Sequence, residues 1–484
     1  MYIGIDLGTS AVKLLLMDKQ GTVIRTVSKE YPLIFPQENW IEQDPDKWVE
    51  ATFEGLKDIS TGFEKEIKSI SFSGQMHGLV ILDSSNTVIR PAILWCDQRT
   101  EKECEFLNNE ISENIIELTG NIALTGFTAP KILWVKNNEP ENFKKIHKIM
   151  LPKDYIAFKL SGVYSTDVSD ASGMLILDVK NRTWSKQMLE ILEISEQQLP
   201  KLFESYEVVG NISNNVAEEL GLNKDIKIVA GAGDQAAGAV GVGVVKDGIL
   251  SVALGTSGVV FANSSKYFAD SQARLHSFCH GNGGYHQMGV MLSAAASLKW
   301  WIEEIQKSKN YSLLVEDEAM NSKFDNSLYF LPYLMGERTP HNDPKAKGTF
   351  TGLNIQHTRG DITRCVIEGI TFGLKDSLEL IKEMGVDATC ARVSGGGAKS
   401  PFWRQMIADI FNIQVDTINS TEGPAFGAAI LAAVGDGLFK DVNTACESLI
   451  KVVDSKFPKQ ESTILYNKKY ENFKKLYPIL KNFQ

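Results

Sequence analysis

Cysteine is scarce in this chain, and no two cysteines lie close together in the sequence. The 484 residues include six cysteines, none of which forms a Cys-x-x-Cys pair. A zinc site and a disulfide framework are therefore not expected, because both need cysteines at characteristic spacings. A reducing compartment, the cytoplasm, is the expected location.

Long apolar runs, a basic surplus and a targeting segment are also missing. No uncharged run reaches the ~18 apolar residues of a membrane-spanning helix, and the chain opens on a strand-like sequence without a basic leader. The net charge is -10, which leaves little positive charge for a nucleic-acid backbone. We therefore expect neither a membrane nor a nucleic acid as partner. A small anionic ligand stays open, because it needs only local positive potential.

No proline- or serine-rich linker divides the chain. Its length predicts two or three domains, and its composition, 43% apolar and 23% charged residues, is typical of a globular protein. Strands and helices alternate in both halves, which predicts α/β domains. The second half restarts with a strand pair near residue 249. The restart puts the boundary near Lys246, giving domains 1–245 and 246–484 with a cleft between them.

The elements expected in the two halves are similar. In the first half we expect strands at 1–6, 12–18, 23–27, 67–72, 79–82 and 226–230, and a helix from Pro45 with Asp44 as its N-cap. In the second half we expect a hairpin at 249, helices at 293–305 and 361–384, and a strand at 391–394.

The tetrapeptide Leu-Gly-Thr-Ser occurs twice, at residues 7–10 and 254–257. Each copy lies between two apolar runs, so each predicts a strand, a turn and a second strand. Glycine lets a ligand approach the backbone, and the hydroxyls and free N–H groups suit a phosphate. The four residue types are common, so the strand context, rather than the identity, favours a duplication. Asp6 precedes the first copy and Ala253 the second, so only the first half brings a carboxylate to the phosphates.

Two aspartates are candidates for chemistry. Asp6 either starts a turn or holds Mg²⁺ beside nucleotide phosphates. Asp234 follows the small residues Gly231-Ala232-Gly233, and is either a plain helix N-cap or a general base for an attacking hydroxyl. In the second case the helix N-terminus would keep it ionised at neutral pH. The spacing does not decide between these interpretations.

Two glycine-bounded loops are candidates for ligand contact. The loop at residues 74–78 presents Gln75, Met76 and His77 between apolar strands. These groups offer hydrogen bonds and little charge, which suits a neutral polyol, although His77 could be an ordinary surface histidine. Residues 395–398, Gly-Gly-Gly-Ala, admit a nucleotide against bare backbone or form only a tight turn. This run is neither a Walker loop nor a dinucleotide fingerprint.

Other conspicuous residues have simpler interpretations. The small residues at 423–429 predict a closely packed helix. Trp134, Trp300 and Trp301 are expected in the core rather than on a ligand platform.

Several long motifs, in order, resemble the FGGY carbohydrate kinases over nearly the whole chain. Residues 1–10 resemble the opening of that family and residues 126–134 its first signature. Residues 348–368 resemble its second signature, with Cys365 where alanine or serine is usual. Within the family, the segments at 73–78, 90–95, 151–155 and 336–342 most resemble the members that act on D-xylulose.

The resemblance implies two ribonuclease H-like domains, as in actin and hexokinase, and ATP-dependent phosphorylation of D-xylulose to D-xylulose 5-phosphate in xylose catabolism. It implies that the first domain binds the sugar and holds the base, Asp234, and that Asp6 serves Mg²⁺. The implied sugar contacts are Gln75, Met76, His77, Asp234 and Gln235. The implied nucleotide contacts are Gly8, Thr9, Ser10, Lys13, Gly255, Thr256, Ser257, Gly396, Gly397 and Ala398.

The chain departs from some family members at Gln235 and Cys96, where those members have asparagine. The rival substrates are ribulose, glycerol and gluconate. An acid sugar would call for an arginine in the loop at 74–78, and none is there. Rival classes are an actin- or chaperone-type ATPase and an inactive relative of the kinases. The sequence leaves the oligomeric state open, a homodimer included.

Overall fold

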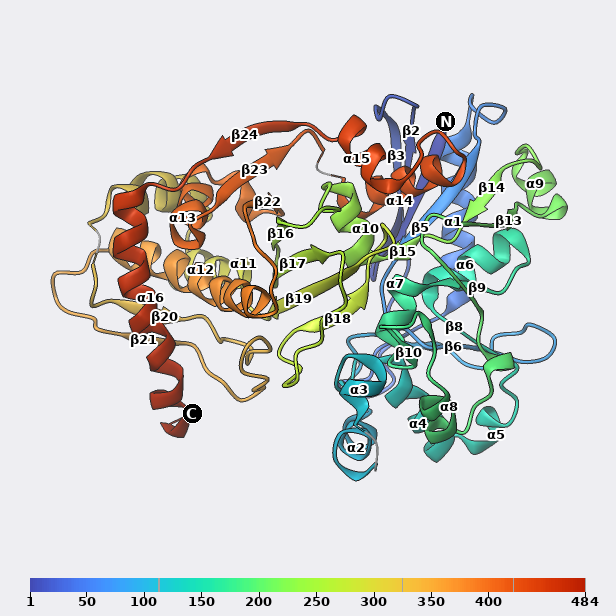
Figure 1. The fold of residues 1–484 in the computed structure, drawn as a ribbon, viewed down its shortest axis with the longest axis horizontal. Helices are drawn as coiled ribbons and strands as arrows, with labels where there is room; N and C mark the ends of the chain where they lie inside the picture. Colours follow the sequence, from blue (N-terminus) through green and yellow to red (C-terminus); the bar gives the residue numbers. More distant parts are fainter. Residues whose placement is uncertain (112–113, 324, 421, 484) are drawn as a thin grey trace.

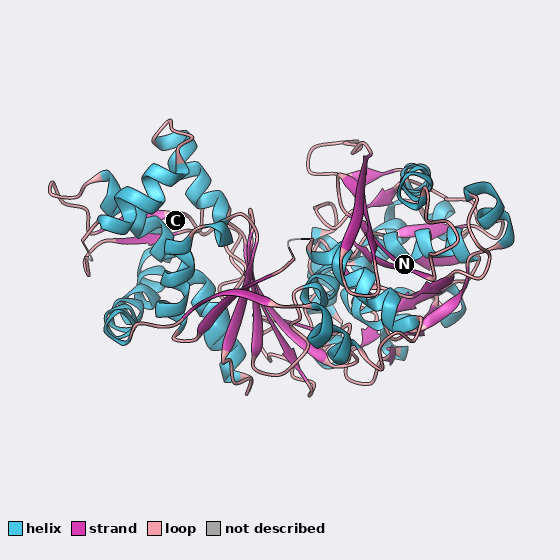
Figure 2. Cartoon of the chain, turned by 90° about the horizontal axis from the view of Figure 1, so that it is seen from above, coloured by secondary structure: helices cyan, strands magenta, loops and turns pink. Residues whose placement is uncertain are grey.

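A computed structural model describes residues 1–111, 114–323, 325–420 and 422–483. The chain forms two α/β lobes, each built on a mixed sheet (Figures 1 and 2). The predicted two-domain fold of the actin and hexokinase type is therefore confirmed. In the part of the chain that the structure describes, no helix is long and apolar enough to cross a membrane.

The first sheet combines parallel and antiparallel strands. In spatial order its strands are β13 (Val208–Asn211), β14 (Lys227–Val229), β5 (Ser69–Gly74), β1 (Tyr2–Leu7), β2 (Ala11–Met17) and β3 (Val23–Glu30). The short strand β15 (Ala232–Gly233) also pairs with β5. Strands β14, β5 and β1 are parallel to one another. Strand β2 is antiparallel to β1, and β3 is antiparallel to β2.

The second sheet repeats this arrangement. Its strands are β24 (Val452–Lys456), β23 (Gln414–Ile418), β22 (Cys390–Ser394), β16 (Ile249–Leu254), β17 (Gly258–Ser264), β19 (Tyr285–Met291) and β18 (His276–Cys279). Strands β23, β22 and β16 are parallel to one another, like β14, β5 and β1. Strand β17 is antiparallel to β16, and β19 is antiparallel to β17, like β2 and β3 in the first sheet. The shared topology confirms the duplication predicted from the repeated tetrapeptide.

The predicted helices are present, with shifted ends. Helix α1 (Pro45–Ser60) begins after Asp44, whose side chain accepts from the N–H of Asp46. Helices α12 (Arg359–Glu383) and α13 (Pro401–Phe411) pack around the second sheet. The helix expected at 293–305 is α11 (Ala295–Lys299), which continues as a π-helical segment at Trp300–Ile305. Trp134 and Trp301 are buried in the core, and the half-buried Trp300 packs against it.

Between β5 and β14 the first lobe carries short helices and irregular segments. These are α2 (Glu101–Glu105), α3 (Ile115–Thr119), α4 (Thr128–Asn138), α5 (Pro140–Phe143), α6 (Pro152–Ser161), α7 (Val168–Ala171), α8 (Lys186–Leu192) and α9 (Asn214–Leu220). Helices α4, α5 and α8 lie at the lower right of Figure 1, and α9 lies higher, beside β14.

Two helices join the lobes at the centre of the molecule (Figure 1). Helix α10 (Asp234–Gly241) leads out of the first lobe, and α14 (Gly423–Gly435), from the second half of the chain, packs on α10 and on β1. Glycines allow this approach: a Cβ on Gly4 would lie 2.0 Å from the carbonyl oxygen of Ala425, and one on Gly427 would lie 1.8 Å from that of Ala237. The closely packed helix predicted at 423–429 is therefore confirmed.

Candidate active site

Asp6, Ser73 and Asp234 meet where three neighbouring parallel strands end. Asp6 is near the end of β1, Ser73 pairs with it in register on β5, and Asp234 directly follows β15. The hydroxyl of Ser73 donates to Asp6 Oδ1 over 2.8 Å. The carboxyl ends of parallel strands are the usual place for a ligand in α/β proteins. The structure thus brings together the two carboxylates that the sequence separates by more than 200 positions.

The structure corrects two expectations about Asp234: its place at the start of the helix and its ionisation at neutral pH. It is the first residue of α10, and Gly233 is the N-cap, so the plain N-cap interpretation is wrong. The pKa of Asp234 is raised to about 7, because its carboxyl is largely removed from water and lies near Asp6. Hydrogen bonds from Gln235 oppose the rise in pKa without cancelling it. The helix N-terminus therefore does not keep this carboxyl fully ionised at neutral pH, which corrects the expectation from the sequence.

The loop at residues 74–78 lies beside these carboxylates. Met76 is buried, and a Cβ on Gly233 would lie 2.9 Å from its sulfur, so the loop packs directly on the chain before Asp234. Gln75 is also buried, and its Nε2 donates to Gln43 Oε1 over 3.1 Å. The side chain of Gln75 thus supports strand β4 (Glu42–Gln43), and its contact with a sugar stays a prediction.

His77 is held in one orientation by several contacts. Its backbone has a positive φ of 70°, which is uncommon for a residue other than glycine. Its Nδ1 lies 2.7 Å from the carbonyl oxygen of Gly173, and its ring stacks on Phe127 with centroids 4.6 Å apart. Burial lowers the pKa of His77 to about 3, so the imidazole is neutral. A fixed, neutral imidazole suits a hydroxyl-bearing ligand, and the surface-histidine interpretation is wrong.

The backbone of His77 is fixed by the start of α4. The carbonyl oxygen of His77 accepts hydrogen bonds from Lys131 Nζ at 2.9 Å and from Thr128 Oγ1 at 3.0 Å. Lys131 Nζ also donates to the carbonyl oxygen of Gly126 over 2.6 Å. Burial lowers the pKa of Lys131 to about 7. In the sequence, Lys131 is notable only as part of the segment that resembles the first family signature. In the structure, its side chain links the loop at 74–78 to Gly126.

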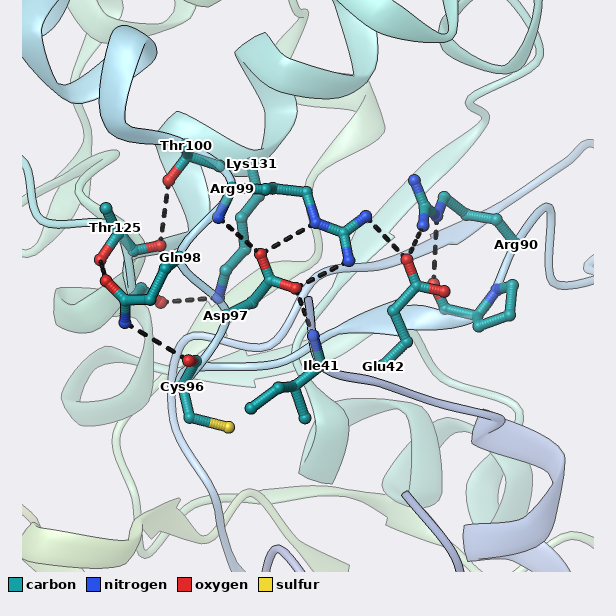
Figure 3. Close-up of polar contacts among 12 residues, drawn as sticks. Ile41, Glu42, Arg90, Cys96, Asp97, Gln98, Arg99, Thr100, Thr125 and Lys131 are labelled. Atoms are coloured by element: carbon teal, nitrogen blue, oxygen red, sulfur yellow. Dashed lines mark hydrogen bonds and ion pairs between the residues drawn. The ribbon is translucent and has the colours of Figure 1, made fainter. Parts of the chain in front are cut away.

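A buried ionic network supports the loop that contains Cys96 (Figure 3). Asp97 accepts two hydrogen bonds from the guanidinium of Arg99, at 2.9 and 2.7 Å, and Arg99 also pairs with Glu42 at 2.7 Å. Asp97 also accepts from the backbone N–H groups of Ile41 and Arg99. Cys96 itself contributes its carbonyl oxygen, so the thiol that replaces asparagine is not part of the network.

The first Leu-Gly-Thr-Ser turn connects β1 to β2. Trp95 Nε1 donates to Thr9 Oγ1 over 3.0 Å, and Ser10 is exposed. Lys13, on β2, forms an ion pair with Glu422, which lies directly before α14. Lys13 therefore spans from the first lobe to a residue of the second half of the chain.

The second Leu-Gly-Thr-Ser turn connects β16 to β17, and the glycine run packs against it. Gly395 has a φ of 85°, and a Cβ there would lie 2.6 Å from the carbonyl oxygen of Leu254. A Cβ on Gly397 would lie 2.9 Å from Leu254 Cβ, whereas one on Gly396 would meet nothing within 4 Å. The run is therefore a tight turn, and its middle glycine faces open space.

Two neighbouring cavities adjoin these turns. One, of about 530 Å³, is lined from both lobes by residues that include Asp234, Gln235, Ala253, Gly395 and Ala398. The other, of about 630 Å³, is lined by Thr256, Gly396, Gly397, Lys399 and Ser400 together with apolar side chains. The predicted base and the glycine run thus border the first cavity, and the second turn and the glycine run border the second.

Among the described residues, no group of three or more His, Cys, Asp or Glu side chains is arranged to hold a metal ion by itself. This finding is compatible with Mg²⁺, which proteins often bind through one or two carboxylates together with substrate phosphates. Asp6 offers one carboxylate, half-buried at the end of β1.

The comparisons with known proteins agree with this geometry. The FGGY family of carbohydrate kinases, N-terminal domain, matches residues 1–241, and the C-terminal domain of the same family matches residues 250–435. The chain belongs to the FGGY family of carbohydrate kinases. As members of a kinase family, such proteins use ATP as a substrate.

Individual relatives cover nearly the whole chain. The xylulose kinase of Bacillus subtilis (strain 168) is 40% identical, over 99% of this chain and 97% of its own length. Two crystal structures from Lactobacillus acidophilus are each 30% identical. The ligand-bound xylulose kinase has a TM-score of 0.93 and covers 99% of this chain and 98% of its own. The gluconate kinase has a TM-score of 0.94 and covers 100% and 99%.

Proposed function

We propose that this chain transfers the γ-phosphoryl group of ATP to the 5-hydroxyl of D-xylulose, giving D-xylulose 5-phosphate in xylose catabolism. The observation that carries the proposal is the position of Asp234. Its carboxyl has a pKa of about 7 and lies at the wall of the interlobe cavity, which is also lined by Ala253, the residue directly before the second Leu-Gly-Thr-Ser turn. The 40% identity to a xylulose kinase, over 99% of this chain, supports D-xylulose as the sugar.

Asp234 acts in this proposal as the general base. A carboxyl whose pKa is close to the working pH is ionised often enough to accept a proton and basic enough to take it from a hydroxyl. The sugar lies against His77, Met76 and Gln235, so that its hydroxyl meets Asp234. Removing that proton as the oxygen attacks in line with the leaving ADP makes the oxygen a better nucleophile.

The two turns hold the nucleotide. Gly8, Thr9, Ser10 and Lys13 contribute from the first lobe, and Gly255, Thr256 and Ser257 from the second. Gly396, Gly397 and Ala398 border the rest of the nucleotide, because they line the two cavities next to the second turn. With this assignment, residues 1–245 form the sugar and base domain and residues 246–484 the nucleotide domain.

Asp6 holds Mg²⁺ in this proposal. The donor set fits, because Asp6 is a carboxylate near a second carboxyl, Asp234, and two such groups close together favour a cation between them. When bound, Mg²⁺ neutralises charge on the phosphate oxygens. Ser73 keeps Asp6 oriented through the hydrogen bond to Oδ1.

Gluconate is the second candidate substrate, because one observation favours it. The loop at 74–78 has no arginine, but Arg338 of the second lobe lies close enough to His77 and His276 to influence both electrostatically. A cation at that place could meet the carboxylate of an acid sugar. The lack of an arginine in the loop at 74–78 therefore does not exclude gluconate.

The test is a panel of D-xylulose, D-ribulose, glycerol and gluconate with ATP, run on the wild type and on Asp234→Ala. We expect D-xylulose to give the highest kcat/KM and Asp234→Ala to lose it. Preference for gluconate would replace the sugar assignment, and near wild-type turnover by Asp234→Ala would refute the base. If no panel member changes the basal ATPase rate or the Tm, the actin- or chaperone-type alternative is favoured.

We also propose a cytoplasmic location, because the six cysteines are all free thiols in the structure. Sedimentation velocity, with and without ATP, determines the oligomeric state, which the sequence leaves open.

A further inference from the structure

One segment of the first lobe touches both halves of the sugar site. This segment, residues 167–173, comprises the end of β9 (Ser165–Asp167), α7 and the first residues of a 3₁₀ turn, Ser172–Met174. At one end of it, Ser169 Oγ accepts a hydrogen bond of 3.2 Å from the N–H of Gly233, the residue before Asp234. At the other end, the carbonyl oxygen of Gly173 lies 2.7 Å from His77 Nδ1.

The segment is anchored by a buried lysine. Lys153, in the first turn of α6, is fully buried, and its ammonium lies 2.9 Å from Asp167 Oδ1 and 2.6 Å from Asp154 Oδ1. Asp170 is 3.6 Å from the same ammonium. A buried ammonium is stable only with such partners. The ion pair with Asp167 therefore fixes where the segment begins.

Asp167 passes this constraint on to Ser169. Asp167 Oδ2 accepts from the backbone N–H and the hydroxyl of Ser169, and also from the hydroxyl of Ser205 at 2.7 Å. All these groups are buried. Because the Ser169 hydroxyl donates to Asp167, its lone pairs are left to accept from Gly233.

We propose that Lys153 and segment 167–173 are a positioning platform that sets the base and the sugar-binding histidine relative to each other. The platform touches neither the reacting hydroxyl nor the phosphate. It acts through Gly233 on Asp234 and through Gly173 on His77. The proposal rests on the proposed function, because it assigns the two ends of the platform to proton removal and to sugar binding.

The two ends predict different kinetic defects. Ser169→Ala removes the acceptor of the Gly233 N–H, so we expect kcat to fall about 10-fold with KM for the sugar unchanged, since a small displacement of a catalytic group costs rate. A Cβ on Gly173 would lie 2.5 Å from two ring atoms of His77. Gly173→Ala should therefore raise KM for the sugar and leave KM for ATP unchanged.

Each variant has a matched control. Ser205→Ala also removes one buried hydroxyl bond to Asp167 Oδ2, but Ser205 does not bond Gly233 through its side chain, so kcat should stay within about 2-fold of wild type. For Gly173 the control is Gly210→Ala, whose added Cβ would meet only Val163 Cγ2, at 3.4 Å. Lys153→Met should combine both defects.

A second measurement does not depend on activity. Amide hydrogen exchange at Gly233 should be faster in Ser169→Ala than in wild type or Ser205→Ala, because a buried N–H has lost its acceptor. Equal kcat and equal exchange in Ser169→Ala and Ser205→Ala would overturn the platform. A wild type that phosphorylates none of the panel sugars would instead overturn the proposed function, and the exchange data would still decide the platform.

Discussion

The hydroxyl of Ser73 donates to the carboxylate of Asp6 across two parallel strands, over 2.8 Å. The equivalent pair in the second lobe is Ser394 beside Ala253. The duplicated lobes therefore keep the serine and the glycine after it, but only the first lobe has the carboxylate. This asymmetry places the proposed metal and proton chemistry on the first lobe and leaves backbone contacts with the nucleotide to the second.

Asp6→Asn should lower kcat by about 100-fold or more, because a preorganised charge in the site is lost. The Mg²⁺ concentration needed for half-maximal rate should rise. Both are measured by titrating Mg²⁺ in a coupled kinase assay. The control is Asp58→Asn, an exposed carboxylate that pairs with Lys29 on the outer surface. An unchanged Mg²⁺ dependence in Asp6→Asn would show that Asp6 does not serve the metal.

The pH dependence of kcat should report Asp234. A base must be ionised, so kcat should rise with pH through about 7, the pKa of this carboxyl. A profile already flat between pH 5 and 8 would argue against Asp234 as the group that limits the rate.

Asp234 should also affect stability. Its folded pKa is above its unfolded value, so the folded state binds more protons, and the free energy of unfolding falls as pH rises between about 4 and 7. Asp234→Asn should therefore have a higher Tm than wild type at pH 8, with the difference shrinking toward pH 4. Thermal denaturation at the two pH values tests this sign, and a lower Tm at pH 8 would contradict it.

Gly427→Ala should destabilise the protein by several kcal/mol or prevent folding, because the new Cβ would clash with rigid backbone at the junction of α10 and α14. Gly396→Ala is the matched change. Gly396 has φ -61° and ψ -40° and open space around it, so the Gly396→Ala variant should have the Tm of the wild type. If the nucleotide lies there, however, KM for ATP should rise. Equal Tm values for the two variants would contradict the packing argument.

Lys13→Met should raise KM for ATP with little change in KM for the sugar, because the variant lacks the positive charge next to the first Leu-Gly-Thr-Ser turn. Lys19→Met, on the exposed turn after β2, is the control for loss of one positive charge. Both are measured by initial rates at varied ATP. If the two variants have the same KM for ATP, Lys13 has no role beyond its ion pair with Glu422.

Much of the fold could be predicted from the sequence because the signals are local. The hairpins at 7–10 and 254–257 and the N-cap at Asp44 depend on residues within a few positions of each other. The position of α14 could not be predicted in the same way. It comes from the second half of the chain and packs on β1, which needs Gly4 and Ala425 to meet.

In the candidate site, too, some features follow from local sequence and others from long-range packing. The family, the two turns and the residue types at the ends of β1 and β5 can be read from short motifs in the sequence. The protonation of Asp234, the burial of Gln75 and the contacts of Lys131 and Lys153 depend instead on how distant segments pack together. A pKa depends on lost water and on charges brought near from distant positions, and neither is fixed until the chain is packed.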